Sequence, residues 1–298
     1  MLSTNEGKVC DAIVRRLEER EQRKRTDLCW PERENHKSAV EIAFKLGDQL
    51  YALEHTLIEP FEGHMRMEAQ TEKLFTPIIS ALKDALGEDA LFELYLRLNA
   101  LDGRKPAELS RIQQAIIAWV KATAPTIPRR PHPDYKGTPF GPVMVENIPL
   151  VLCRFEPPII PGQHFRIRHT VDNIDLLRTD RMKAAIEKKF PKLAAWKKNE
   201  NAKSILVLEQ NDIQLTNPSI VADTYLPLVN AREDRPDETY LVATCIGPKW
   251  WMWPILIGDR SYFDIAQSDE SLHWEVDPSE LDDLTKRSAR TEESQTGL

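Results

Sequence analysis

Two acidic side chains, Glu41 and Glu54, carry the strongest chemical signal in this 298-residue sequence. Residues 40 to 46 alternate apolar and polar side chains, as a strand does, and Gly47-Asp48 separates them from a second run, residues 49 to 58. A tight turn with glycine at its first central position suits type II′. In the register that this turn sets, Glu41 lies opposite Glu54, and because two ionised carboxylates repel each other, a cation between them is expected.

Oxygen ligands of this kind suit Mg²⁺ or Mn²⁺, which commonly use one or two protein carboxylates together with a substrate phosphate. The alternative is that the two carboxylates diverge into solvent and bind nothing. Side chains alternate along a strand, so Glu41, Glu54 and Thr56 share one face. His55 points to the other face, where the expected role is that of a hydrogen-bonded core histidine.

The pattern resembles the PD-(D/E)XK phosphodiesterases, which include restriction endonucleases and Holliday junction resolvases. In this sequence Glu41 precedes Glu54-His55-Thr56 by thirteen positions. The resemblance covers about the first 60 residues. It implies a restriction endonuclease-like αβββαβ core, with Glu41 and Glu54 as metal ligands and a glutamate of the preceding helix, Glu18 or else Glu19, as a further ligand. It also implies metal-dependent hydrolysis of DNA or RNA.

One residue departs from the family pattern, because Thr56 stands where the family has its lysine. In the family that lysine helps to orient the attacking water and stabilises charge on phosphorus, whereas a threonine hydroxyl is neutral. Several lysines could replace it, on the same strand face or on a basic helix further along: Lys45, Lys188, Lys189 and Lys192. The alternative function is a binding module with a degenerate site, which recognises nucleic acid, a nucleotide or a protein partner.

Charge is unevenly distributed along a chain of net charge −7. Residues 164 to 203 hold eleven Lys or Arg against five Asp or Glu. Such a window predicts a local surface for a polyanion, and a solvated amphipathic helix is the alternative. The expected contacts to a nucleic-acid backbone are Arg166, Arg168, Arg181 and Lys183. Glu209 follows a buried strand, where open α/β sheets place ligand groups, and a polar loop explains it equally well.

Strands alternate with helices after residue 143, which predicts an α/β protein with a mixed sheet flanked by helices. We expect one elaborated domain, residues 1–260, with a helical insertion at about 65–123 and a proline-rich loop at 125–142. Residues 264–298 form an acidic tail with a composition typical of disorder. The sequence shows no apolar span and no signal peptide, so we expect a cytoplasmic protein without a membrane partner, either a monomer or a homodimer.

Overall fold

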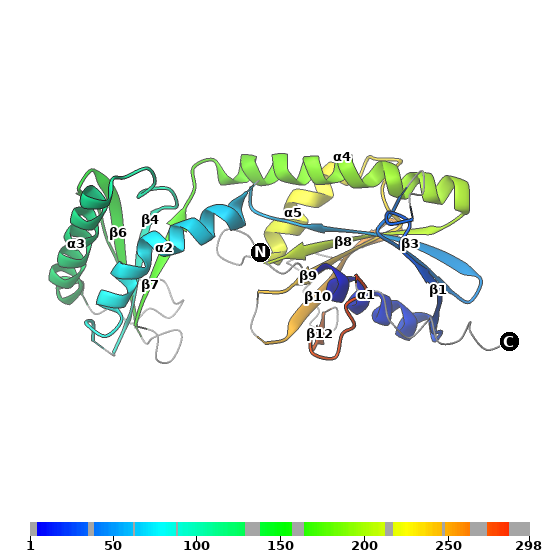
Figure 1. Ribbon diagram of the computed structural model, residues 1–298, viewed down its shortest axis with the longest axis horizontal. Helices are drawn as coiled ribbons and strands as arrows, with labels where there is room; N and C mark the ends of the chain where they lie inside the picture. The colour runs from blue at the N-terminus through cyan, green and yellow to red at the C-terminus, as the bar shows by residue number, and fades with distance from the viewer. Residues whose placement is uncertain are drawn as a thin grey trace. The chain divides into compact units, whose positions relative to one another are not determined.

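The computed structural model divides into two compact units (Figure 1). Unit 1 comprises Met1–Phe61 and Asp175–Leu298, and unit 2 comprises Glu62–Ile174. Each unit combines a sheet with helices, so the α/β class predicted from the sequence is confirmed. The structure describes residues 5–34, 39–61, 63–87, 89–128, 138–156, 164–211, 217–245, 248–262 and 273–285. Within these ranges, no helix combines the length and the apolar character that a membrane crossing requires.

Unit 1 is built on a mixed sheet with the strand order β1-β2-β3-β8-β9-β10-β11, and β12 pairs with β10. Its strands are β1 (Arg25–Cys29), β2 (Ile42–Leu46), β3 (Gln49–Leu57), β8 (Lys203–Gln210), β9 (Glu238–Ala243), β10 (Trp250–Ile257), β11 (Arg260–Ser261) and β12 (Trp274–Val276). The first three strands form an antiparallel meander. β3, β8 and β9 are parallel, so their carboxyl ends meet at one edge of the sheet.

Helices cover both faces of this sheet (Figure 1). α1 (Glu6–Glu21) packs on one face through a stripe that includes Val9, Ile13 and Leu17. α4 (Ile174–Glu200) and α5 (Pro218–Val229) pack on the other. The sequence predicts a break in α4 at Pro191, but the helix continues through it. The buried side chains on both sides of the proline, Phe190 and Leu193, hold the helix on the sheet despite the lost hydrogen bond.

The predicted hairpin and its register are confirmed, because Ile42 pairs with Leu53 and Leu46 pairs with Gln49. Gly47 has a φ of 61°, as the first central position of a type II′ turn requires. β2 starts at Ile42, so Glu41 lies one residue before the strand. The sequence predicts that only the other face of the hairpin is core. In the structure the face of Glu54 is buried as well, because α4 packs on it.

Unit 2 has a four-stranded sheet with the order β5-β6-β4-β7. Its elements are α2 (His64–Leu82), β4 (Leu91–Arg97), α3 (Pro106–Thr123), a 3₁₀ turn (Ala124–Thr126), β5 (Thr138–Val145), β6 (Ile148–Phe155) and β7 (Phe165–Thr170). The prediction of a purely helical stretch at 65–123 is wrong at β4, a strand at the centre of this sheet. Phe92, Leu94 and Leu96 point from it into the core under α2 and α3. Residues 129–137 of the proline-rich loop lie outside the described residues.

Part of the acidic C-terminal stretch is ordered and packs within unit 1, against α1 and β10. β12 pairs with β10, and Leu281 and Leu284 join the core beneath α1. The backbone N–H of Asp282 donates to the carboxylate of Asp11, 2.9 Å away. Gly7 allows this close approach, because a Cβ there would lie 2.8 Å from the backbone nitrogen of Leu284. The rest of the stretch, residues 264–272 and 286–298, lies outside the described residues.

Candidate functional site

Three charged side chains meet at the beginning of β2 and on the α4 face of β3. The Lys189 ammonium, from α4, lies 2.5 Å from Oε1 of Glu41 and 2.5 Å from Oε2 of Glu54. Glu54 is fully buried, and the Lys189 side chain is 8% exposed. The ammonium of Lys192, one turn further along α4, is 3.3 Å from Oε1 of Glu54. The cation between the two carboxylates is therefore a lysine of the chain itself.

Glu41 also belongs to a second group, on the α1 face of the sheet. Its Oε2 accepts a hydrogen bond of 2.5 Å from the backbone N–H of His55. One ligand atom each of Glu6, Glu41 and His55 lies within 4.8 Å of the others. Glu6 is the first residue of α1, so the helix terminus, the start of β2 and the end of β3 build this group together. Two carboxylates and an imidazole at such distances can hold a divalent metal ion.

His55 is further fixed by Glu209, near the carboxyl end of β8. Its Nε2 lies 2.9 Å from Oε2 of Glu209, and both side chains are buried. The other oxygen of Glu209 accepts from the Thr244 hydroxyl at 3.0 Å and from the Asn5 amide at 3.3 Å. The histidine is thus hydrogen-bonded, as expected. A carboxylate that orients an imidazole is also the usual support behind a histidine ligand of a metal.

Burial and repulsion change the acid–base properties of the group on the α4 face. Burial first, and then the negative charge of Glu41, raise the pKa of Glu54 to about 7 in spite of Lys189. Burial alone lowers the pKa of Lys189, but the attraction of Glu41 and Glu54 outweighs it and raises that pKa to about 12. Lys189 is therefore charged at neutral pH, and Glu54 is a carboxyl group that can hold or release a proton there.

Burial and mutual repulsion also raise pKa values in the group on the α1 face. Burial raises the pKa of Glu6, and the nearby carboxylate of Glu41 raises it further. Cys10, one turn along α1 and fully buried, has its thiol pKa raised by burial and then by Glu41 and Glu6. A bound cation would relieve this accumulation of negative charge, because it favours the ionised form of each carboxylate.

The remaining residues predicted for the metal site lie in different surroundings. Thr56 is buried on β3, beside Leu208 of β8. Glu18 is twelve residues beyond Glu6 on α1, which corresponds to about 18 Å along a helix. There it accepts a hydrogen bond of 2.9 Å from the backbone N–H of Arg25 and pairs with that residue's guanidinium. The structure brings Glu6, and not Glu18, to Glu41.

The four basic residues predicted to contact phosphates separate into two pairs. Arg166 and Arg168 are on β7 of unit 2, where both pair with the buried Glu93. Arg181 and Lys183 are on α4, where Arg181 donates to the backbone oxygen of Leu57 at the end of β3. Lys183 is exposed. Among the lysines considered as replacements at the Thr56 position, Lys189 contacts both glutamates, Lys188 is exposed, and Lys45 pairs with Asp27 at 2.8 Å.

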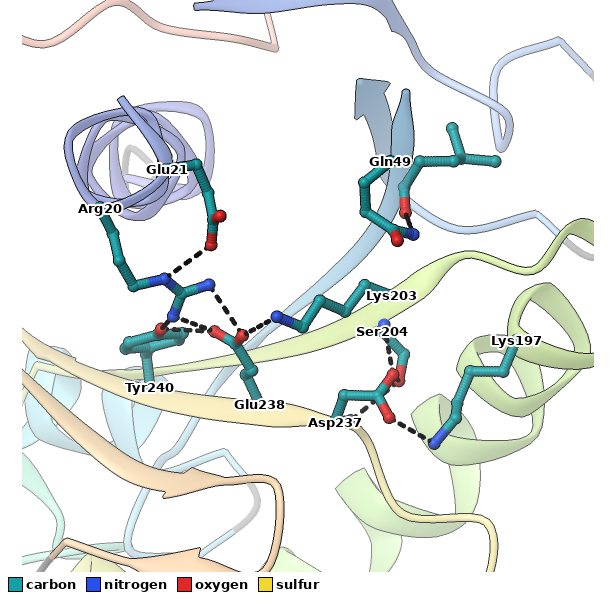
Figure 2. Close-up of polar contacts among 10 residues, drawn as sticks. Arg20, Glu21, Gln49, Lys197, Lys203, Ser204, Asp237, Glu238 and Tyr240 are labelled. Atoms are coloured by element: carbon teal, nitrogen blue, oxygen red, sulfur yellow. Dashed lines mark hydrogen bonds and ion pairs between the residues drawn. The ribbon is translucent and has the colours of Figure 1, made fainter. Parts of the chain in front are cut away.

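A second polar network lies at the opposite, amino ends of β3, β8 and β9 (Figure 2). It borders a cavity of about 520 Å³ whose lining includes Lys197, Lys203, Asp237 and Glu238. Glu238 is fully buried, and its carboxylate accepts two hydrogen bonds of 2.9 Å from Arg20 and one of 2.5 Å from the hydroxyl of Tyr240. It also pairs with the Lys203 ammonium at 2.9 Å. Asp237 pairs with Lys197 at 2.7 Å. Each carboxylate has a cationic partner, so this network is a structural one.

In comparisons with known proteins, no family model, curated sequence or solved structure matches the chain.

The sequence predicts neither Glu6 nor His55 as a metal ligand, and it does not single out Lys189 among the lysines. Glu6 reads as a helix-capping acid, and only the packing of α1 across β3 brings it to Glu41 and His55. Lys189 is one of several lysines in a basic helix, and its role depends on which face of α4 turns to the sheet. Glu209 carries a usable signal, because it comes directly after the apolar run 205–208, at the edge where β3 and β8 end.

Proposed function

We propose that the chain is a divalent-metal-dependent nuclease that hydrolyses phosphodiester bonds of DNA or RNA. The observation that carries the proposal is the convergence of Glu6, Glu41 and His55 at the carboxyl ends of parallel strands, with the Lys189 ammonium on the same Glu41 carboxylate. Metal-dependent phosphodiester hydrolysis needs a group of metal ligands and a nearby cation that stabilises charge on phosphorus.

The order of elements supports the proposal. Without unit 2, which is inserted between β3 and α4, unit 1 begins α1-β1-β2-β3-α4-β8. This is the αβββαβ order that the resemblance to PD-(D/E)XK enzymes implies. Glu41 lies one residue before the second strand of this order and Glu54 lies on the third, close to where the resemblance expects the two acids.

The proposed metal ligands are Glu6, Glu41 and His55, with Glu209 orienting the histidine. Glu6 takes the place of Glu18. Glu54, which the resemblance also implies as a ligand, pairs with Lys189 on the α4 face and is not part of this group. Carboxylates suit both Mg²⁺ and Mn²⁺, and the imidazole favours Mn²⁺ of the two. When bound, the ion would polarise a phosphoryl oxygen and lower the pKa of a water molecule.

Lys189 takes the part that the resemblance assigns to the family lysine. With a pKa raised to about 12, it cannot act as a base at neutral pH, so its contribution is electrostatic. It fixes one oxygen of Glu41 and adds a positive charge at the site. Arg181, which donates to Leu57 at the end of β3, and Lys192, one turn from Lys189, are the cations that we expect to contact phosphate oxygens, with Lys183 extending this contact along α4.

A cleavage assay tests the proposal. Purified protein is incubated with plasmid, single-stranded DNA and RNA, with Mn²⁺, Mg²⁺ or EDTA. We expect cleavage only with metal, and a loss of about 100-fold or more in Glu6→Gln and His55→Gln. Glu19→Gln, which removes an exposed acid from the same helix, is the matched control. Cleavage that survives both site substitutions would refute the assignment of the ligands.

A second candidate is the binding module without catalysis, and one observation favours it. Lys189 already neutralises part of the charge on Glu41 and Glu54, so the protein does not depend on a metal for that purpose. Binding of nucleic acid without cleavage under any metal condition would support the module. Mn²⁺ binding in solution, measured by calorimetry and abolished in Glu6→Gln, would support the nuclease.

The proposed setting is the cytoplasm. None of the four cysteines, Cys10, Cys29, Cys153 and Cys245, forms a disulfide in the described part of the chain, which is typical of proteins in a reducing compartment. The expected partner is nucleic acid. A homodimer is the alternative to a monomer, and sedimentation analysis would distinguish the two.

A further inference from the structure

The sheet of unit 2 has one face turned away from its core. On β4, Phe92, Leu94 and Leu96 point into the core with α2 and α3, so the alternate residues, Glu93 and Tyr95, point to the opposite face. The parallel pairing of β4 with β7 sets Glu93 beside Arg166 and Tyr95 beside Arg168. We call the surface made by Tyr95, Arg166 and Arg168 the arginine face.

A buried carboxylate organises the arginine face. Glu93 is only 2% exposed, and its Oε1 contacts the guanidinium groups of both Arg166 and Arg168, the second at 3.4 Å. Its Oε2 accepts a hydrogen bond of 2.5 Å from the hydroxyl of Tyr95. One negative charge therefore holds two positive charges and an aromatic ring in place, and the group keeps a net positive charge.

The contacts with Glu93 leave N–H donors of both guanidinium groups available to a ligand. A guanidinium has five N–H donors, and Arg168 reaches Glu93 only through its Nε. The side chains of Arg166 and Arg168 are 19% and 27% exposed. Since they alternate along one strand, their Cα atoms are roughly 6.6 Å apart, and the two groups can each bind a different phosphate.

We propose that the arginine face binds single-stranded nucleic acid, with Arg166 and Arg168 on consecutive phosphates and the ring of Tyr95 against a base. Tyr95 lies on a central strand of the sheet, between β6 and β7, where an unpaired base can stack on it. In a duplex the base faces are stacked on one another, so no base can stack on Tyr95. The inference shares the ligand class with the proposed nuclease, but binding here requires neither metal nor cleavage.

Fluorescence anisotropy with labelled oligo(dT) and oligo(U) in EDTA tests the proposal on the full-length protein. Arg168→Gln is the first variant, because its contact with Glu93 is the longer one. We expect about tenfold weaker binding and a salt slope smaller by about 0.7, as for the loss of one phosphate contact to a single strand. Arg111→Gln, on α3 and so on the other side of the sheet, removes the same charge and should bind like the wild type.

A pair of substitutions at Tyr95 separates the ring from its hydroxyl. Tyr95→Phe and Tyr95→Leu both remove the hydrogen bond to Glu93, so any structural effect of that loss is common to them. We expect Tyr95→Phe to bind within about twofold of the wild type and Tyr95→Leu to bind about five- to tenfold more weakly. Circular dichroism of each variant confirms that it is folded.

Three results would overturn the proposal. The first is oligonucleotide binding that Arg168→Gln leaves unchanged. The second is a duplex competitor that displaces the single strand as effectively as an unlabelled single strand does. The third is a wild-type dimer that Arg168→Gln converts to a monomer, since the face would then contact a second copy. Because EDTA is present throughout, failure of the proposed nuclease activity leaves these measurements unaffected.

Discussion

The ammonium nitrogen of Lys189 lies 2.5 Å from a carboxylate oxygen of Glu54, and both side chains are buried. The same nitrogen is 2.5 Å from Glu41, so one lysine joins two acids across the hairpin. Removing one partner of a buried ion pair is costly, because the charge that remains has lost both water and its counterion.

Lys189→Met should therefore destabilise the protein strongly. It leaves Glu41 and Glu54 together, with Lys192 as the nearest cation to Glu54. We expect a loss of about 3–5 kcal/mol in the free energy of unfolding, measured by urea denaturation at a pH above 7, where Glu54 is ionised in the wild type. Lys188→Met, at the exposed neighbouring position, should stay within about 0.5 kcal/mol of the wild type. Equal stability of the two variants would contradict the ion pairs. Adding Glu54→Gln to Lys189→Met should restore part of the loss.

Mn²⁺ should stabilise the folded protein if Glu6, Glu41 and His55 hold it. A ligand that binds only the native state adds about 2.7 kcal/mol when its concentration is 100 times the dissociation constant. The thermal midpoint should rise with Mn²⁺ concentration in the wild type and in Glu19→Gln, and should stay constant in Glu6→Gln. A midpoint that rises equally in all three proteins would place the ion elsewhere.

The buried Glu238 should make stability fall in acid. Burial raises its pKa, but the hydrogen bonds from Arg20, Tyr240 and Lys203 outweigh this, so the pKa lies below its usual value of 4.5 (Figure 2). The stabilisation from the charged form is therefore complete above about pH 4.5 and is lost as the pH falls through the lowered pKa.

Comparison with Glu238→Gln isolates this contribution. We expect the variant to be less stable than the wild type by about 3–5 kcal/mol at pH 7, because Arg20 and Lys203 lose their shared partner. Urea denaturation at decreasing pH should show the two proteins converging only below about pH 4.5. A difference that stays constant down to the acid transition would contradict the assigned direction of the pKa.

Gly7→Ala should destabilise the protein, although alanine is the better helix former by about 1 kcal/mol. The added Cβ would lie 1.9 Å from a carboxylate oxygen of Asp283 and 2.7 Å from the backbone nitrogen of Thr285. Such overpacking costs about 1–3 kcal/mol. In a chain that ends after Val276 the clash is gone, and the same substitution should then stabilise. Thermal unfolding of the four proteins checks this change of sign.

The hairpin could be predicted from the sequence because its determinants are local. Gly47 sets the turn, and the turn sets the pairing that brings Glu41 opposite Glu54. The identity of the cation is not local, since it depends on how α4 is rotated about its axis. Glu6 and Glu18 are equally plausible on α1 until the helix is placed on the sheet, and only the placement decides which end reaches Glu41.

Strand β4 has a signal in the sequence, but the patterns on both sides of it favour a helix. Phe92, Leu94 and Leu96 alternate with Glu93 and Tyr95, which is the period of a strand. The helical stripes of α2 and α3 on both sides are longer, and they favour a helical interpretation of the whole stretch. The contact between Glu93 and its arginines could not be predicted from the sequence either. It requires β4 to pair with β7, which brings together residues 73 positions apart.

The insertion of unit 2 between β3 and α4 has a consequence for synthesis on the ribosome. β3 is complete at Leu57, but its parallel neighbour β8 begins only at Lys203. Because translation proceeds at roughly 5–20 residues per second, the β3 edge of the nascent β1-β2-β3 meander has no partner strand for many seconds. Synthesis of unit 2 is complete before β8 is made. Once folded, unit 2 shortens the flexible chain that must close into a loop when β3 pairs with β8. The order of translation therefore favours folding of unit 2 before folding of unit 1.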